Sequence, residues 1–267
     1  MTPLNSFLLY PTILIHGIGG DTSDLTDLAS NLRNRGADVY NMEIGDGKLD
    51  SIFWSMNKQC QVLGENINNL SLQSEKINLI GVSQGGLLAR CYVEKYGHFI
   101  KPVHSLITYG TPHMGVYSSF LELKRLNYWK NPYKYDEYLN DNDFLAYLNN
   151  DRNHTDMKLY RNNILSLDNF LVVWTDLEKV VDPPESTKFE FFNISMAGTS
   201  GHLEIVNFLE SNIYNEDKIG LRELYENGKM LLKQYDCKHE EFKHPKCFLK
   251  NFTSQSYNLL DLTLSLL

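Results

Sequence analysis

The sequence is short of cysteines, of positive charge and of long hydrophobic runs, and each shortage excludes a class of protein. Four cysteines among 267 residues are too few for a disulfide scaffold, and none has the CxxC or His spacing typical of zinc sites. Lys and Arg number 25 against 33 Asp and Glu, so the formal net charge is −8 and offers no basic face to nucleic acid. We therefore expect no metal, no cofactor and no nucleic-acid partner.

The apolar stretch at the N-terminus, residues 7–15, is interrupted by Tyr10 and Pro11. It lacks the basic start and the small-residue cleavage site of a signal peptide, and it is too short to span a membrane. A buried strand explains it better. Because 42% of the residues are hydrophobic and Gly and Pro number only 17 and 8, we expect one globular domain covering residues 1–267, most simply a monomer.

Strand-like apolar segments alternate with helical segments along the chain. The expected strands are residues 11–17, 37–44, 76–82, 103–109, 170–174 and 229–233, and the expected helices are 24–35, 52–70, 84–96 and 252–267. Repeated βαβ units with short loops predict an α/β fold with a mostly parallel central sheet and helices on both faces. A functional site is then expected at the carboxyl edge of the sheet. Residues 116–167 break the alternation and are expected to form a cap insertion.

The strongest chemical signal is Gly-Val-Ser-Gln-Gly at residues 81–85, a G-x-S-x-G that follows a buried strand and precedes a helix. In this context Ser83 is expected to be a nucleophile on a sharp turn, with glycines where side chains would collide with neighbouring backbone. An oxyanion formed there needs two backbone N–H donors. We expect them from Gln84, directly after the nucleophile, and from Ile18, in the glycine-rich loop 16–20.

A serine nucleophile of this kind is followed along the chain by an acid and then by a histidine. Two aspartates follow the strand at 170–174, and the residue order alone leaves both Asp176 and Asp182 open. Two histidines, His239 and His244, follow the last strand, and both remain candidates for the base.

Several motifs together resemble the palmitoyl-protein thioesterases, a family of α/β-hydrolases. HGIGG begins at residue 16, GVSQGG at residue 81 and GTPHMGV at residue 110, and the similarity runs nearly end to end. The resemblance implies that Asp182, in a Val-Asp-Pro turn, is the acid and that His239 is the base. It also implies the α/β-hydrolase fold, lysosomal or secretory location, glycosylation near Asn153, and removal of palmitate from S-acylated proteins or peptides and other long-chain acyl thioesters.

Substrate contacts are expected from His16 and His113, which belong to two of these motifs, and from Phe120 and Phe144 in the cap. The same cap residues could equally pack the cap onto the sheet. An ester lipase of the same fold, acting on oxyesters, is the alternative activity. The four cysteines permit the bridges 60–91 and 237–247, or buried free thiols.

Overall fold

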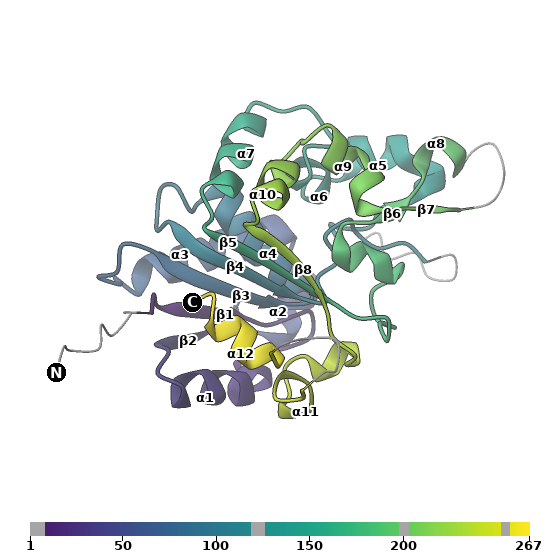
Figure 1. Cartoon of the computed structure of the whole chain (residues 1–267). Helices are drawn as coiled ribbons and strands as arrows, with labels where there is room; N and C mark the ends of the chain where they lie inside the picture. Colours follow the sequence, from purple (N-terminus) through teal and green to yellow (C-terminus); the bar gives the residue numbers. More distant parts are fainter. Residues whose placement is uncertain (1–8, 119–125, 198–202, 252–256) are drawn as a thin grey trace.

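Six parallel strands form one sheet, in the order β2-β1-β3-β4-β5-β8 (Figure 1). The structure is a computed structural model that describes residues 9–118, 126–197, 203–251 and 257–267. The strands are β1 Thr12–Ile15, β2 Val39–Met42, β3 Ile77–Val82, β4 Val103–Tyr109, β5 Asn169–Trp174 and β8 Met230–Gln234. Every residue of β1 and β3 is buried, as expected for parallel strands covered on both faces.

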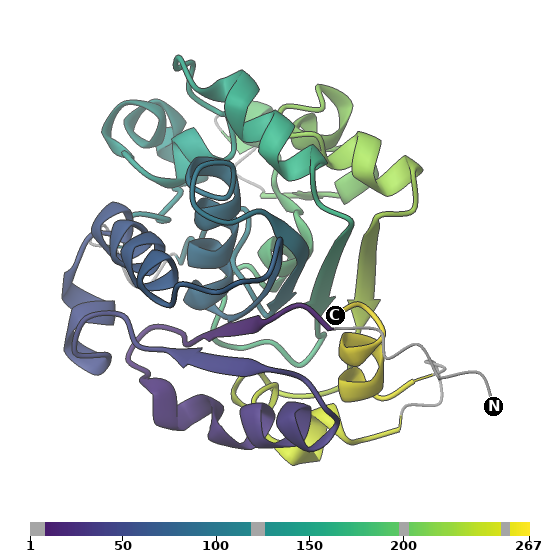
Figure 2. The ribbon, with the colours of Figure 1, turned by 90° about the vertical axis from the view of Figure 1, so that its left-hand side faces the viewer.

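Helices cover both faces of the sheet, which Figure 2 shows from the side. On one face lie α3 (Met56–Asn69) and α4 (Gln84–Lys95), whose apolar side chains share a core with alternate residues of the strands. On the other face, α1 (Thr26–Asn34), α11 (Pro245–Phe248) and α12 (Leu259–Leu264) pack on the remaining strand side chains. The expected α/β architecture is therefore confirmed.

The helix expected over residues 52–70 is two helices. The first, α2 (Lys48–Phe53), ends before Ser55, whose hydroxyl accepts the N–H of Lys58 and caps the start of α3. A serine in this capping position favours a new helix start, which a count of apolar spacings alone does not detect. The separate α2 places Ser51 next to the loop that follows β1.

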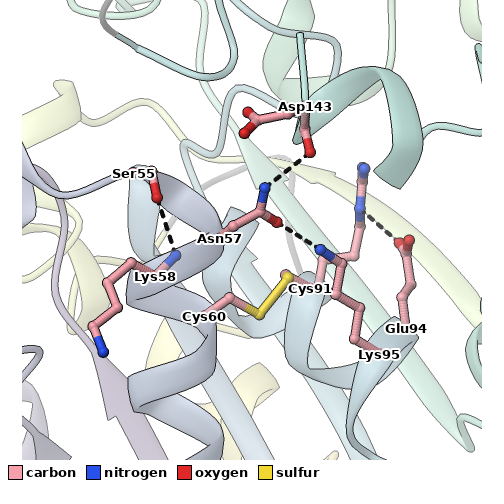
Figure 3. Close-up of a disulfide and its surroundings, with 9 residues drawn as sticks. Ser55, Asn57, Lys58, Cys60, Cys91, Glu94, Lys95 and Asp143 are labelled. Carbon is pink, nitrogen blue, oxygen red and sulfur yellow. Dashed lines mark hydrogen bonds and ion pairs between the residues drawn. A yellow bond between two sulfur atoms is a disulfide. The ribbon is translucent and has the colours of Figure 1, made fainter.

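Both disulfides that the sequence left open are formed. Cys60 on α3 is bonded to Cys91 on α4 (Figure 3), and Cys237 is bonded to Cys247 in the loop and helix that follow β8. Beside the first bridge, Asn57 on α3 accepts a hydrogen bond from Lys95 on α4, with Nζ 2.7 Å from Oδ1. The two helices on this face are thus joined covalently as well as by packing.

Two chain segments between β4 and β8 lie together above the sheet (Figure 1). The first supplies η2 (Pro132–Lys134), α5 (Tyr135–Asp141), α6 (Leu145–Leu148) and α7 (Met157–Leu165), within the expected cap insertion. The second, after β5, supplies η3 (Pro184–Lys188), β6 (Phe191–Phe192), α8 (Ile194–Ala197), β7 (Ile205–Val206), η4 (Phe208–Glu210), α9 (Asn212–Asn215) and α10 (Leu221–Glu226). Arg161 on α7 forms an ion pair with Asp217, and this contact joins the two segments.

The remaining short helices are η1 (Thr22–Leu25), after the first strand, and η5 (His239–Glu241), after the last. Among the residues that the structure describes, no helix combines the length and the apolar character needed to cross a membrane.

Candidate active site

Ser83 stands at the turn between β3 and α4 with a backbone that few residues adopt. Its φ is 55° and its ψ is −125°. A positive φ costs conformational energy in any residue other than glycine. A Cβ on Gly81 would overlap the backbone of Gly86, and one on Gly85 would overlap the carbonyl of Ile15. These glycines therefore allow the sharp turn to form against the neighbouring strand.

Hydrogen bonds from the end of β4 hold the strained turn in place. The N–H of Ser83 donates to the carbonyl of Tyr109 at 2.8 Å, and the hydroxyl of Thr111 donates to the carbonyl of Ser83 at 3.0 Å. Both backbone groups of Ser83 are thus fixed by the next strand, as a preorganised nucleophile requires.

The loop after β1 forms a tight turn beside Ser83. The N–H of Gly20 donates to the carbonyl of Gly17, and Gly19 takes a φ of +67°, which glycine permits without strain. A Cβ on Gly17 would lie only 3.1 Å from the Cβ of Ser83, so the loop approaches the nucleophile closely. The turn does not use the N–H of Ile18, and Gln84, as the first residue of α4, has no acceptor for its N–H within the helix.

His239 lines the same pocket as Ser83, a cavity of about 150 Å³ at the carboxyl edge of the sheet. Gly17, Ile18 and Val180 also line it. The His239 ring packs closely on the loop after β4, because a Cβ on Gly110 would lie 3.1 Å from its Nδ1. His244, the alternative base, is half-exposed and faces Asp27, with 3.9 Å between Nδ1 and Oδ2.

The acid that holds His239 is Glu178. Its Oε2 lies 2.6 Å from Nδ1 of His239, and its Oε1 accepts the N–H groups of Val180 at 2.8 Å and Val181 at 3.0 Å. The side chain of Glu178 is fully buried. Because an ionised carboxylate only accepts, Nδ1 carries a proton, which leaves Nε2 as the nitrogen that can act as a base.

The prediction that Asp182 holds this histidine is wrong. Asp182 is exposed, and its carbonyl accepts the N–H of Tyr117. Asp176 accepts an exposed hydrogen bond from Gln234, with 2.6 Å between Oδ2 and Nε2. Glu178 lies four residues before Asp182, where the loop after β5 still passes the histidine and turns its backbone N–H groups toward the carboxylate. A search that admitted glutamate as well as aspartate in this order would have included it.

Electrostatics favour an ionised Glu178. Burial raises the pKa of its carboxyl. The hydrogen bond from His239, the charge of that ring when it is protonated, and the two backbone N–H groups outweigh burial and leave the pKa below its ordinary value. The carboxylate therefore stays charged under mildly acidic conditions.

This lowered pKa makes a prediction about acid stability. A carboxyl whose pKa is lower in the folded than in the unfolded chain stabilises the fold above its unfolded pKa, about 4.5, and loses that contribution as the pH falls further. The difference in Tm between the wild type and Glu178→Gln should therefore shrink when the pH is lowered from 6 to 3. Thermal unfolding measured across this range tests it, and a difference that stays constant would contradict the assignment.

The side chains predicted to contact substrate lie elsewhere. His113 is fully buried, stacks on Phe189 with 4.2 Å between ring centroids, and has Nε2 3.0 Å from the hydroxyl of Thr108. Burial and then the nearby charge of Arg90 hold its pKa well below the ordinary value, so it is a neutral packing residue. The prediction that His113 contacts substrate is therefore wrong.

His16 and Phe144 are also buried. Nδ1 of His16 donates to the carbonyl of Gly17 at 3.0 Å, and Nε2 lies 3.2 Å from Oε1 of Glu43. The ring therefore stabilises the loop at 16–20 and does not line the pocket. Phe144 is fully buried in the core, beside the Lys95 ammonium. It therefore packs its segment onto the core, as the alternative interpretation expected, and does not line the pocket. Phe120 lies outside the described residues. In the part of the chain that the structure describes, no cluster of three or more His, Cys, Asp or Glu could hold a metal.

Comparisons with known proteins identify the family that this chain resembles. The family described as palmitoyl protein thioesterase matches residues 11–125 and 120–239. Palmitoyl-protein thioesterase 3 of Dictyostelium discoideum is 30% identical over 91% of this chain and 90% of its own length. A lysosomal thioesterase PPT2 homolog of Drosophila melanogaster is 25% identical over 83% of this chain and 82% of its own.

Solved structures show the same fold at low sequence identity. An extracellular alpha/beta-hydrolase from a Paenibacillus species superposes with a TM-score of 0.51 and 12% identity over 96% of this chain and 97% of its own. A serine hydrolase involved in carbazole degradation gives a TM-score of 0.50 and 14% identity over 96% of this chain and 90% of its own. The chain therefore has the α/β-hydrolase fold.

Proposed function

The chain belongs to the palmitoyl-protein thioesterase family, and on this basis we propose that it removes palmitate and similar long-chain acyl groups from S-acylated cysteines of proteins or peptides. The observation that carries the proposal is the shared pocket of Ser83 and His239, together with the 2.6 Å contact that Glu178 makes with the far side of the histidine ring. A serine, a buried carboxylate and a histidine, in this order along the chain, form an acyl-transfer site.

In the proposed reaction, Ser83 Oγ attacks the thioester carbonyl while Nε2 of His239 takes the hydroxyl proton. Glu178 keeps the ring in the required tautomer and stabilises the imidazolium that forms. The N–H groups of Ile18 and Gln84 stabilise the oxyanion, at the positive end of α4. The intermediate then expels the thiolate, which takes the proton from His239, and an ester between the acyl group and Ser83 remains. Water activated by His239 hydrolyses this ester and regenerates Ser83.

A thiolate leaves easily because thiol pKa values are about 8.5, so little acid assistance is needed. Recognition of the acyl chain therefore carries much of the substrate specificity. Each buried methylene contributes about 0.8 kcal/mol. Ile18 and Val180, two apolar lining residues of the pocket, have exposed fractions of 36% and 59%. We place the first methylenes of the acyl chain against these two side chains.

The proposed location is the lysosome or the secretory pathway. Two disulfides are typical of proteins that fold in an oxidising compartment, and the Drosophila relative is named as a lysosomal thioesterase. Asn153, in the sequence Asn-His-Thr, is exposed and so accessible to glycosylation.

A fluorophosphonate label followed by paired substrate assays tests the proposed activity. The reagent should modify Ser83 and abolish turnover of a palmitoyl thioester. The wild type should also hydrolyse that thioester with a higher kcat/KM than the oxyester of equal chain length. A clear preference for the oxyester would instead establish the lipase alternative, and absence of hydrolysis of both would contradict the proposed function.

A further inference from the structure

A buried network of hydrogen bonds joins the loop that carries Ile18 to Gln84 at the start of α4. Its centre is Ser51 on α2, a side chain with only 2% exposure. The hydroxyl of Ser51 accepts the N–H of Gly19 at 2.9 Å and donates to the carbonyl of Lys48 at 2.9 Å. One side of the network is therefore attached to the residue directly after Ile18.

The other side of the network is attached to Gln84. The backbone carbonyl of Ser51 accepts a hydrogen bond from Nε2 of the Gln84 side chain at 2.9 Å and another from Nε2 of Gln59 at 3.3 Å. Ser51 thus contacts both segments that supply the proposed oxyanion donors, through its hydroxyl on one side and its carbonyl on the other.

The orientation of each amide in the network follows from its partners. Carbonyls only accept, so Nε2 of Gln84 faces Ser51 and Nε2 of Gln59 faces the carbonyls of Ser51 and Trp54. Oε1 of Gln59 is then left to accept the second N–H of Gln84, at 3.0 Å. Oε1 of Gln84 accepts the hydroxyl of Tyr128, also at 3.0 Å. Since Gln59, Gln84 and Tyr128 are all buried, the network is rigid as well as satisfied.

We propose that Ser51 is a positioning residue for the oxyanion hole, an inference that rests on the proposed function. Donors stabilise an oxyanion only when they lie within about 2.7–3.1 Å of its position, so small displacements of the loop are costly. The turn at residues 17–20 has one internal hydrogen bond, between Gly20 and Gly17, and its tip is tied to α2 by the Ser51 hydroxyl. Removal of that hydroxyl leaves the N–H of Gly19 unpaired and frees the adjacent N–H of Ile18 to move.

Ser51→Ala tests this role, with Ser55→Ala as the matched control. Each change removes one hydroxyl, that of Ser51 on α2 itself and that of Ser55 in the segment between α2 and α3. Ser55, however, caps α3 by accepting the N–H of Lys58 (Figure 3), and its hydroxyl makes no hydrogen bond to the loop at 17–20. With a palmitoyl thioester as substrate, Ser51→Ala should lower kcat by about 10- to 100-fold and leave KM within about twofold, since complete loss of one oxyanion donor lowers kcat by about 10²–10³. Ser55→Ala should lower Tm and leave kcat unchanged.

A second readout separates positioning from a general loss of structure. A long-chain alkyl boronic acid forms a tetrahedral adduct with the nucleophile and resembles the transition state, whereas palmitate itself is planar at the carboxyl. Ser51→Ala should weaken inhibition by the boronic acid by the same factor as it lowers kcat/KM, and should leave inhibition by palmitate unchanged. Equal weakening of both inhibitors would contradict the positioning role.

Failure of this inference is distinguishable from failure of the proposed function. If the wild type hydrolyses the thioester and Ser51→Ala does so with an unchanged kcat, the inference is overturned and the proposed function stands. If the wild type does not hydrolyse the thioester, the rate of fluorophosphonate labelling of Ser83 replaces kcat. A slower rate in Ser51→Ala then supports the inference, and an equal rate overturns it. Should the alanine variant not fold, Ser51→Cys, whose thiol is a weaker acceptor, takes its place.

Discussion

Replacement of Ser83 by alanine is expected to lower kcat for a palmitoyl thioester by about 10⁶-fold, because the variant cannot form an acyl-enzyme. The remaining rate should come from the oxyanion donors and from substrate binding alone. Steady-state release of free thiol measures the effect, and KM is expected to change little.

The Ser83→Ala protein should keep its fold. Alanine removes only the hydroxyl, and the hydrogen bonds that hold the turn come from the backbone N–H and carbonyl of residue 83. Thermal unfolding near the wild-type Tm is the control. Thioester turnover within tenfold of the wild type in a folded Ser83→Ala protein would contradict the nucleophile assignment.

Replacement of Glu178 by glutamine is expected to lower kcat by about 10⁴-fold, the scale found when the acid of such a triad becomes an amide. The amide can present its N–H₂ group to Nδ1 of His239, which favours the wrong ring tautomer. Without the carboxylate, the imidazolium that forms during attack also loses its stabilising charge. The comparison is kcat at a pH where the wild type is most active.

Two aspartate variants serve as matched controls for Glu178→Gln. Asp182→Asn and Asp176→Asn make the same carboxylate-to-amide change within the same loop, but neither carboxylate contacts His239: Asp182 is exposed and Asp176 pairs with Gln234. Both should keep kcat within about threefold of the wild type. A severe loss in Asp182→Asn with near-normal activity in Glu178→Gln would reverse the assignment made from the structure.

The strands and the serine turn could be predicted from the sequence because both depend on neighbours in the chain. An apolar run bounded by glycine favours a buried strand wherever it packs, and the glycines at 81 and 85 are required by clashes within the turn itself and with the adjacent strand. For the same reason the residues of this turn and of the loop at 16–20 can be singled out from the sequence alone.

The acid could not be chosen in the same way. Which carboxylate reaches His239 depends on the path of the loop after β5. The order of residues leaves Asp176 and Asp182 open, and the family resemblance that favours Asp182 carries no information about this path. A sequence motif does not show whether a side chain is buried. His113 occurs in a motif that suggests substrate contact, yet its ring packs among Thr108, Arg90 and Phe189. Local sequence does not distinguish a buried neutral histidine from one that faces a cavity.

Of the two segments above the sheet, only the one within residues 116–167 gives a signal in the sequence, because its composition interrupts the alternation of strands and helices. Its role as a cap stays a prediction. The second segment, between β5 and β8, contains short helices and two-residue strands with too few turns to give a periodic signal. Its place beside the first segment depends on tertiary contacts, such as the hydrogen bond from Asn150 to the carbonyl of Lys218 at 2.8 Å.

Detection of the acyl-enzyme tests the central claim most directly. An S-palmitoyl peptide is mixed with the wild-type protein, the reaction is quenched in acid during the first turnover, and the protein is digested and analysed by mass spectrometry. The account predicts that the peptide containing Ser83 is heavier by one palmitoyl group. Release of the thiol during that turnover with Ser83 unmodified, or with the acyl group on another residue, would contradict it.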